Sequence, residues 1–281
     1  MSCDMKFDLK EALKRQNIAK SDIDQLREKL KKFKHVPHKM MSDKKLLCFL
    51  NACNGIDDAA SVVSTYYEIR QTYPSIFTNR DPLSKEVQQC LNNQYYVHLK
   101  RTPSNHSVIY HSLSNSKASN YIFDEAVKVF FMTLDSLLCL EGPSNGLIIV
   151  FNMDFVGYRT LLRPSISGLR AFFTYLQDAL PAKLEAIHVL NCVSFFDLVL
   201  SMIKPFMRAD IIQKLHLHPS NTDYDKFYKE WNIPRESMPS NFSGYLENVE
   251  KLHQNHCKIL EDLREYFLAD EKEAQSYKTV Q

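Results

Sequence analysis

Apolar runs of strand length alternate with amphipathic helical segments between residues 146 and 218, and this alternation limits the folds open to the chain. Residues 147–151 read Leu-Ile-Ile-Val-Phe, a continuous apolar run typical of a strand covered on both faces. Two more strands are predicted at 184–190 and 214–218. Two intervening helices are predicted at 164–180 and 194–207. This order indicates right-handed crossovers, so we expect an α/β domain with a mainly parallel sheet.

The segments on either side of this alternation are mostly helical. Three short helices are predicted first, at 8–33, 42–54 and 57–73. Two strands and a long helix come next, at 95–99, 107–111 and 120–140, and a helix at 248–269 precedes a polar end that we expect to be disordered. The interpretation has three parts: an N-terminal helical subdomain (1–78), an α/β domain (79–250), and a C-terminal helix with a polar tail (251–281).

Composition narrows the functional class. A net charge of +2 on 281 residues provides no general attraction to nucleic acid, and no cofactor is indicated. The seven cysteines are scattered and form no Cys-x-x-Cys pair, and the N-terminus has no apolar signal core. No apolar run reaches the roughly 18 residues that cross a bilayer. We therefore expect a monomer in the cytoplasm, with reduced cysteines and at most peripheral contact with membranes.

The chain contains few candidates for catalysis. It has no Gly-x-Ser-x-Gly elbow, no phosphate-binding Gly-x-x-x-x-Gly-Lys loop and no Gly-x-Gly-x-x-Gly. His216 and His218 would share one strand face, but two histidines without a third ligand are weak evidence for a metal, and a structural pair is favoured. Cys48 and Cys53 lie in a strongly apolar helix, which favours buried and inert thiols. We predict no catalytic residue, no metal and no enzymatic activity.

The helix predicted at 194–207 is apolar over an unusually wide arc. Its polar residues form one narrow stripe, and two adjacent apolar rows cover about 220°, against the roughly 100° that one-sided packing needs. Such a helix is covered on two sides. One cover is its own domain, and the other is a partner, a membrane or an apolar ligand, unless the helix is buried in a large core.

Residues 146–218 resemble the CRAL-TRIO lipid-transfer family, and most of all its alpha-tocopherol transfer protein branch. The residues that carry the resemblance are Gly-Leu-Ile-Ile-Val-Phe (146–151), Leu-Pro-Ala-Lys-Leu-Glu-Ala-Ile-His-Val-Leu-Asn (180–191), Ser-Met-Ile-Lys-Pro-Phe (201–206) and Lys-Leu-His-Leu-His (214–218). The N-terminal helices and the segment 238–244 extend it to about residues 20–250. The resemblance implies a CRAL-TRIO fold, in which the sheet and helices enclose an apolar cavity and the 194–207 helix is a mobile lid.

The resemblance also implies which residues bind ligand. By matching position, the wall of the cavity would be Leu147, Phe151, Phe172, Tyr175, Leu176, Leu180, Leu184 and Ile187. Phe196, Val199 and Met202 would close it, and Thr133 stands where a relative has a serine near the polar end of the ligand. Lys183 and Lys214 match basic positions that relatives use to grip phosphoinositides.

The chain departs from the family pattern at several of these places. Asn51 and Cys53 replace two arginines, Asp210 replaces a lysine of the tocopherol branch, and Tyr175 is bulkier than the aliphatic residue found there. The sequence thus favours a carrier that binds one small hydrophobic lipid (a tocopherol, retinoid, carotenoid or similar isoprenoid), transfers it between membranes, and binds anionic lipids weakly. The alternative is an adaptor that binds phosphoinositides or a protein and whose cavity is vestigial.

Overall fold

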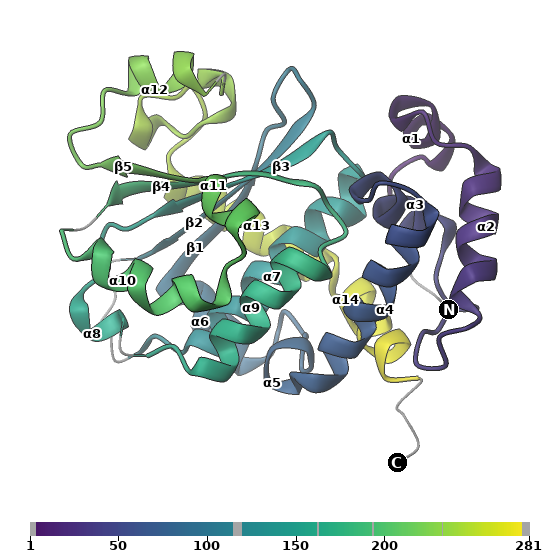
Figure 1. The fold of residues 1–281 in the computed structure, drawn as a ribbon. Helices are drawn as coiled ribbons and strands as arrows, with labels where there is room; N and C mark the ends of the chain where they lie inside the picture. The colour runs from purple at the N-terminus through teal and green to yellow at the C-terminus, as the bar shows by residue number, and fades with distance from the viewer. Residues whose placement is uncertain (1–3, 115–119, 162, 193, 232, 277–281) are drawn as a thin grey trace.

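A five-stranded sheet organises the structure, a computed structural model that describes residues 4–114, 120–161, 163–192, 194–231 and 233–276 (Figure 1). Its strands are β1 (Gln94–Leu99), β2 (His106–Leu113), β3 (Gly146–Asn152), β4 (Leu184–Cys192) and β5 (Leu215–Pro219). The spatial order is β1-β2-β3-β4-β5, with β1 antiparallel to β2 and all other neighbours parallel. The predicted α/β fold with a mainly parallel sheet is confirmed.

Helices precede the sheet, and they include the predicted helical segments 42–54 and 57–73. They are α1 (Leu9–Gln16), α2 (Lys20–Leu30), α3 (Asp43–Ala52), α4 (Ile56–Thr72), α5 (Pro74–Phe77) and α6 (Lys85–Asn93). The single helix expected at 8–33 is wrong, because Asn17 adopts a left-handed conformation (φ 53°) that ends α1 before α2 begins. Asparagine tolerates this conformation better than most residues do.

Different helices cover the two faces of the sheet (Figure 1). One face carries α7 (Phe123–Glu141), α8 (Tyr158–Leu161), α9 (Ile166–Asp178), α10 (Phe196–Ile203) and α11 (Ala209–Gln213). The other face packs against α12 (Tyr224–Glu230) and the 3₁₀ turns that follow it. Side chains of a strand alternate between the faces, so Ile187 belongs to the first core and Leu190 to the second.

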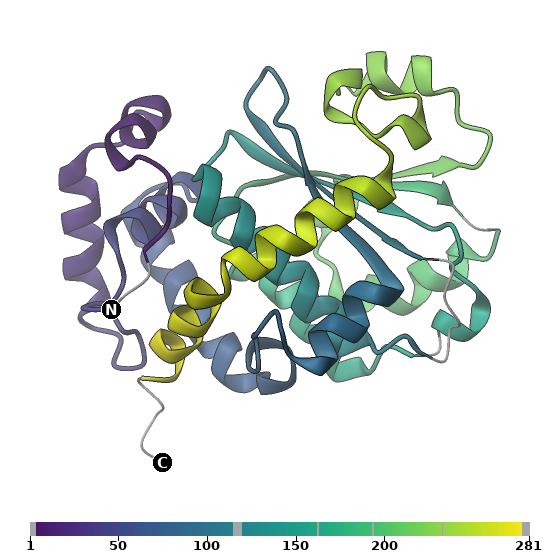
Figure 2. The ribbon, with the colours of Figure 1, turned by 180° about the vertical axis from the view of Figure 1, so that it is seen from behind.

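Two C-terminal helices extend from the sheet to the N-terminal region. The helix α13 (Val249–Asp262) runs beside β1 and α7, and α14 (Arg264–Gln275) continues to α4 (Figure 2). The polar end expected to be disordered from about residue 270 is helical as far as Gln275, which corrects that prediction. Residues 277–281 lie outside the described residues.

Buried ion pairs connect these regions. Asp270 of α14 lies 2.8 Å from Lys45 Nζ, 2.5 Å from Arg70 Nη2 and 2.7 Å from Arg80 Nη1. Arg80 also pairs with Asp135 of α7. Within the described ranges, no single helix is long and apolar enough to span a membrane. The helices α3 and α4 meet that test only as a pair, across a bend of 112°.

Candidate functional site

A cavity of about 250 Å³ lies between the sheet and the helices α7, α9 and α10. His111 of β2, Phe151 of β3 and Val189 of β4 contribute its sheet side, near the carboxyl ends of parallel strands. That edge of a parallel sheet is where ligands usually bind in α/β folds. Phe130 of α7 and Phe172 of α9 form the opposite side, with ring centroids 5.9 Å apart.

The helix α10 covers the cavity. Phe196, Val199 and Ile203 of α10 line it, and so does Met207 just beyond the helix. The helix predicted at 194–207 is shorter in the structure, and Lys204–Phe206 form a 3₁₀ turn. Pro205 accounts for this, since it has no N–H to continue the α-helical ladder.

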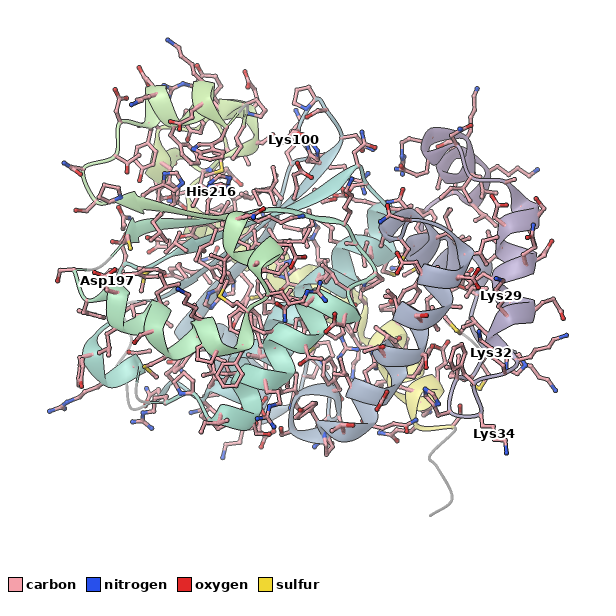
Figure 3. All side chains as sticks on the ribbon, in the orientation of Figure 1. Lys29, Lys32, Lys34, Lys100, Asp197 and His216 are labelled. Carbon is pink, nitrogen blue, oxygen red and sulfur yellow. The ribbon has the colours of Figure 1, made fainter. Side chains whose placement is uncertain are left out.

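A second apolar row of α10 borders the solvent. Leu198 is 42% exposed, and Phe195, Met202 and Phe206 are half-buried, whereas Phe196 is only 6% exposed. The wide apolar arc therefore divides into an inner row over the cavity and an outer row along the surface. Asp197 and the other polar side chains lie on the outer side of the helix (Figure 3).

The structure brings some of the expected ligand residues together and places others elsewhere. Those that line the cavity are Phe151, Phe172, Ile187, Phe196 and Val199. Those outside the lining are Leu147, Leu176, Leu180 and Leu184, which are buried in the main core, Met202 in the outer row of α10, and Tyr175 and Thr133. Leu147 and Leu184 lie at the amino ends of β3 and β4, away from the carboxyl edge where the cavity is.

Tyr175 occupies the core where α9 meets the N-terminal helices. Its ring centroid lies 4.2 Å from Phe131, 5.3 Å from Phe77 and 5.9 Å from Tyr66. The large side chain of Tyr175 therefore fills space between α4, α5, α7 and α9.

Thr133 contacts α13 and not the cavity. Its Oγ1 donates to the Val129 carbonyl at 3.0 Å and lies 3.0 Å from Nε2 of His256. The side chain is buried and its hydrogen-bonding capacity is used within the protein.

Sequence reasoning missed several lining residues. Val127 and Phe130 were on the apolar face of the predicted 120–140 helix, so helical periodicity offered a signal for them. His111 and Thr160 also line the cavity, and no local pattern marks either one. They reach it through the pairing of β2 with β3 and the position of α8.

The cavity is apolar and uncharged. Among its described lining residues there is no Asp, Glu, Lys or Arg. Burial, with a smaller contribution from His253, lowers the pKa of His111 to about 3, so its imidazole is neutral near pH 7. Such a wall can bury a hydrocarbon but has nothing to neutralise a charged group.

Comparison with known proteins identifies the family. The model described as "CRAL/TRIO domain" matches residues 91–244, which is more than half of the chain. The chain belongs to the CRAL/TRIO family. The expected resemblance to the CRAL-TRIO lipid-transfer family is thus confirmed. A second model, "Pinta-like, UBA domain", matches residues 15–87.

Curated relatives are similar over most of this chain. "Alpha-tocopherol transfer protein-like" of Mus musculus is 27% identical over 229 residues, which are 79% of this chain and 64% of that protein. "Clavesin-1" of Mus musculus is 23% identical over 235 residues, 82% of this chain and 65% of that protein. The chain thus spans slightly less than two thirds of these relatives. The structure titled "Crystal structure of Sfh5" aligns over 70% of both chains with a TM-score of 0.47 and 12% identity.

The CRAL/TRIO segment ends in a tight turn. A Cβ on Gly244 would lie 2.0 Å from the Met238 carbonyl oxygen, so only glycine fits there. Ser243 has a φ of 57°, in the left-handed region that favours glycine. This chain therefore makes the turn with a serine in the left-handed region and a glycine directly after it.

The cations expected to bind headgroups are only partly available. Lys183 is exposed, while Lys214 is half-buried and donates to the Leu184 carbonyl. Arg208 pairs with Asp178 and, at 3.2 Å, with Asp210. The basic side chains Lys29, Lys32 and Lys34 lie at the opposite end of the molecule from α10 (Figure 3).

The histidines and cysteines considered from the sequence as metal ligands or reactive thiols are part of the packed structure. His218 Nε2 and His188 Nδ1 share a hydrogen bond of 3.0 Å. The side chain of His216 in β5 (Figure 3) has its ring centroid 3.9 Å from that of Trp231, at the end of α12. No cluster of three or more His, Cys, Asp or Glu side chains in the described ranges could hold a metal. Burial raises the pKa of both Cys48 and Cys53 to about 12, which suppresses the reactive thiolate.

Proposed function

We propose that this chain is a carrier that binds one small hydrophobic lipid, of the tocopherol, retinoid, carotenoid or a similar isoprenoid class, and transfers it between membranes. The observation that carries the proposal is the uncharged apolar cavity covered by α10. Membership of the CRAL/TRIO family and the printed name of the transfer-protein-like relative support it. Affinity would come from buried area, at about 25 cal/mol per Å².

Loading requires α10 to move. The cavity of about 250 Å³ is below the roughly 300 Å³ at which most small-molecule pockets begin. The carboxyl end of the lid is held by α9, because Gln177 Nε2 donates to the Phe206 carbonyl at 3.1 Å and Gln177 Oε1 accepts from Arg208 N at 2.6 Å. We infer that the lid opens from its amino end, about residues 194–196, while Gln177 holds residues 206–208.

Opening exposes an apolar face that favours a membrane interface. The inner row of α10 would then join Leu198 and the half-buried residues of the outer row on one surface. A mobile helix of this kind binds reversibly at the boundary of headgroups and acyl chains. The proposal places the chain in the cytoplasm, as a monomer without enzymatic activity that contacts membranes only transiently.

The test is extraction of the purified protein with organic solvent and mass spectrometry of the extract. We expect one neutral lipid per chain. Val199→Trp fills the cavity from the lid and should abolish uptake, whereas Leu198→Trp, the neighbour on the outer face, should leave uptake unchanged. Equal uptake by both folded variants would contradict binding in this cavity.

The small volume of the cavity favours one alternative, an adaptor that binds phosphoinositides or a protein and whose cavity is vestigial. That function predicts no stoichiometric lipid in the extract and strong binding to vesicles that contain phosphoinositide. The two measurements together separate the carrier from the adaptor.

A further inference from the structure

Four described residues of the cavity lining have side chains with nitrogen or oxygen, and they differ in what they can still bind. They are His111, Tyr121, Asn152 and Thr160. The amide of Asn152 is already occupied. Its Nδ2 donates to Tyr110 Oη and to Asp154 Oδ2, each at 3.1 Å, and its Oδ1 accepts from Asp154 N and from Asn191 Nδ2.

The imidazole of His111 is fixed by its neighbours. Nε2 lies 2.9 Å from Oε1 of Gln94, a side chain that is only 1% exposed. The Gln94 amide is oriented by its own contacts, because its Nε2 donates to Cys90 Sγ at 3.2 Å and its Oε1 accepts from Tyr96 Oη at 2.8 Å. The His111 ring also packs on the rings of Tyr96 and Phe151, with centroids 4.7 Å and 5.7 Å away.

This contact decides the tautomer of His111. An amide oxygen only accepts, so the Nε2 of His111 must carry the proton and donate to Gln94. In a neutral imidazole the other nitrogen is then an acceptor. Nδ1 makes no hydrogen bond to any residue that the structure describes, and the ring lines the cavity.

We propose that His111 is the polar anchor of the cavity and selects a lipid whose polar end donates a hydrogen bond, an isoprenoid or similar alcohol, over the aldehyde, ether or acid of the same hydrocarbon. The inference rests on the proposed carrier function and adds the chemistry of the ligand's polar group. An alcohol donates to Nδ1, whereas an aldehyde or ether presents only lone pairs to the lone pair of Nδ1. A carboxylate would add the cost of burying a charge.

Thr160 is compatible with this selection. The residue is 6% exposed, and its Oγ1 is buried without a hydrogen-bond partner in the described part of the chain. A hydroxyl both donates and accepts, so Thr160 and the phenol of Tyr121 can each bind the oxygen of any of these ligands without distinguishing them. The discrimination is therefore assigned to His111.

Three C15 isoprenoids with one skeleton test the inference: farnesol, farnesal and farnesyl methyl ether. Delipidated protein is given an equimolar mixture, and the bound fractions are measured by native mass spectrometry. We expect farnesol to be preferred over each of the others about three- to ten-fold, the value of one hydrogen bond that forms in protein. Equal binding of all three, or a preference for farnesal, would overturn the assignment.

Two conservative variants distinguish the roles of the two ring nitrogens of His111. His111→Gln places an amide near the position of Nε2, which keeps the contact with Gln94 and removes Nδ1, so the preference for farnesol should disappear. His111→Asn keeps a polar atom near Nδ1 and should retain part of the preference. A preference that survives in a folded His111→Gln protein would contradict the proposal.

The same experiment distinguishes this inference from the proposed function. Uptake of all three compounds without preference refutes the role of His111 and leaves the carrier function standing. If the protein binds none of them and no lipid is extracted from the purified protein, both fail.

Discussion

Asp270 joins the C-terminal helix to the rest of the protein, and its removal should be among the most damaging single changes. The carboxylate side chain is 4% exposed and contacts the cations of Lys45, Arg70 and Arg80. Burial alone would raise the pKa of Asp270, but Arg70, Lys45 and Arg80 together hold it well below its usual range. Asp270→Asn leaves these cations buried with one anion fewer, so we expect the free energy of unfolding to fall by about 3–5 kcal/mol.

Urea denaturation measures this loss. Far-ultraviolet circular dichroism follows all helices, and the fluorescence of Trp231, the single tryptophan, reports the α/β domain. Asp262→Asn is the control, because Asp262 is an exposed acid near the end of α13 and its change should stay within about 0.5 kcal/mol. A loss below about 1 kcal/mol for Asp270→Asn would refute the reasoning, since it would mean that the cluster relaxes or hydrates when the anion is removed.

The pH dependence gives a second check on Asp270. A carboxyl whose pKa is lower in the folded protein contributes stability that is fully present above its unfolded value of about 3.9. That contribution is lost as the pH falls through the lower folded value. The difference between the parent and Asp270→Asn should therefore be constant from pH 8 to pH 5 and shrink only below about pH 4.

Three further predictions address the lid, the headgroup site and the second core. Met202→Asp should slow transfer to vesicles and leave lipid loading intact, whereas Val199→Asp should block loading as well. Equal effects of the two variants on loading would contradict the division of α10 into an inner and an outer apolar row. Asp210→Lys should raise binding to anionic vesicles several-fold in a sedimentation assay, because it adds a cation and releases Arg208 from one partner; unchanged binding would exclude this surface. Burial, then His218 and His216, lower the pKa of His188 to about 3, so its stabilising contribution is complete above about pH 6.5 and decreases in acid. Between pH 7.5 and 5.5 the parent should therefore lose about 1.4 kcal/mol more than His188→Gln in urea denaturation, and parallel losses would show that His188 does not titrate on unfolding.

The strands and most helices were predictable because local patterns specify them. The apolar run at 147–151 lies within β3, and the 184–190 segment lies within β4. The ends of helices were less predictable, because they depend on single residues such as Asn17 and Pro205.

The expected ligand residues show where sequence reasoning stopped. Positional matching placed Leu147 and Leu184 in the wall, but the cavity lies at the carboxyl ends of the same strands. The sequence showed the bulk of Tyr175 but not its direction: the ring packs on Phe131 and Phe77, outside the cavity. Only packed side chains show which part of an apolar layer remains empty.

The amino-acid sequence by itself determined the α/β class, the family and the two-sided apolar character of the segment that became α10. The class and the two-sided character follow from periodicity over a few residues, and the family follows from the resemblance of short motifs. The tertiary structure decided which row of α10 covers the cavity, that His111 and Thr160 meet it, and that Asp270 of an apparently polar tail is buried among three cations. These features join residues far apart in the chain, such as Lys45 and Asp270, and no local pattern records such a contact, because it exists only when the whole chain has packed.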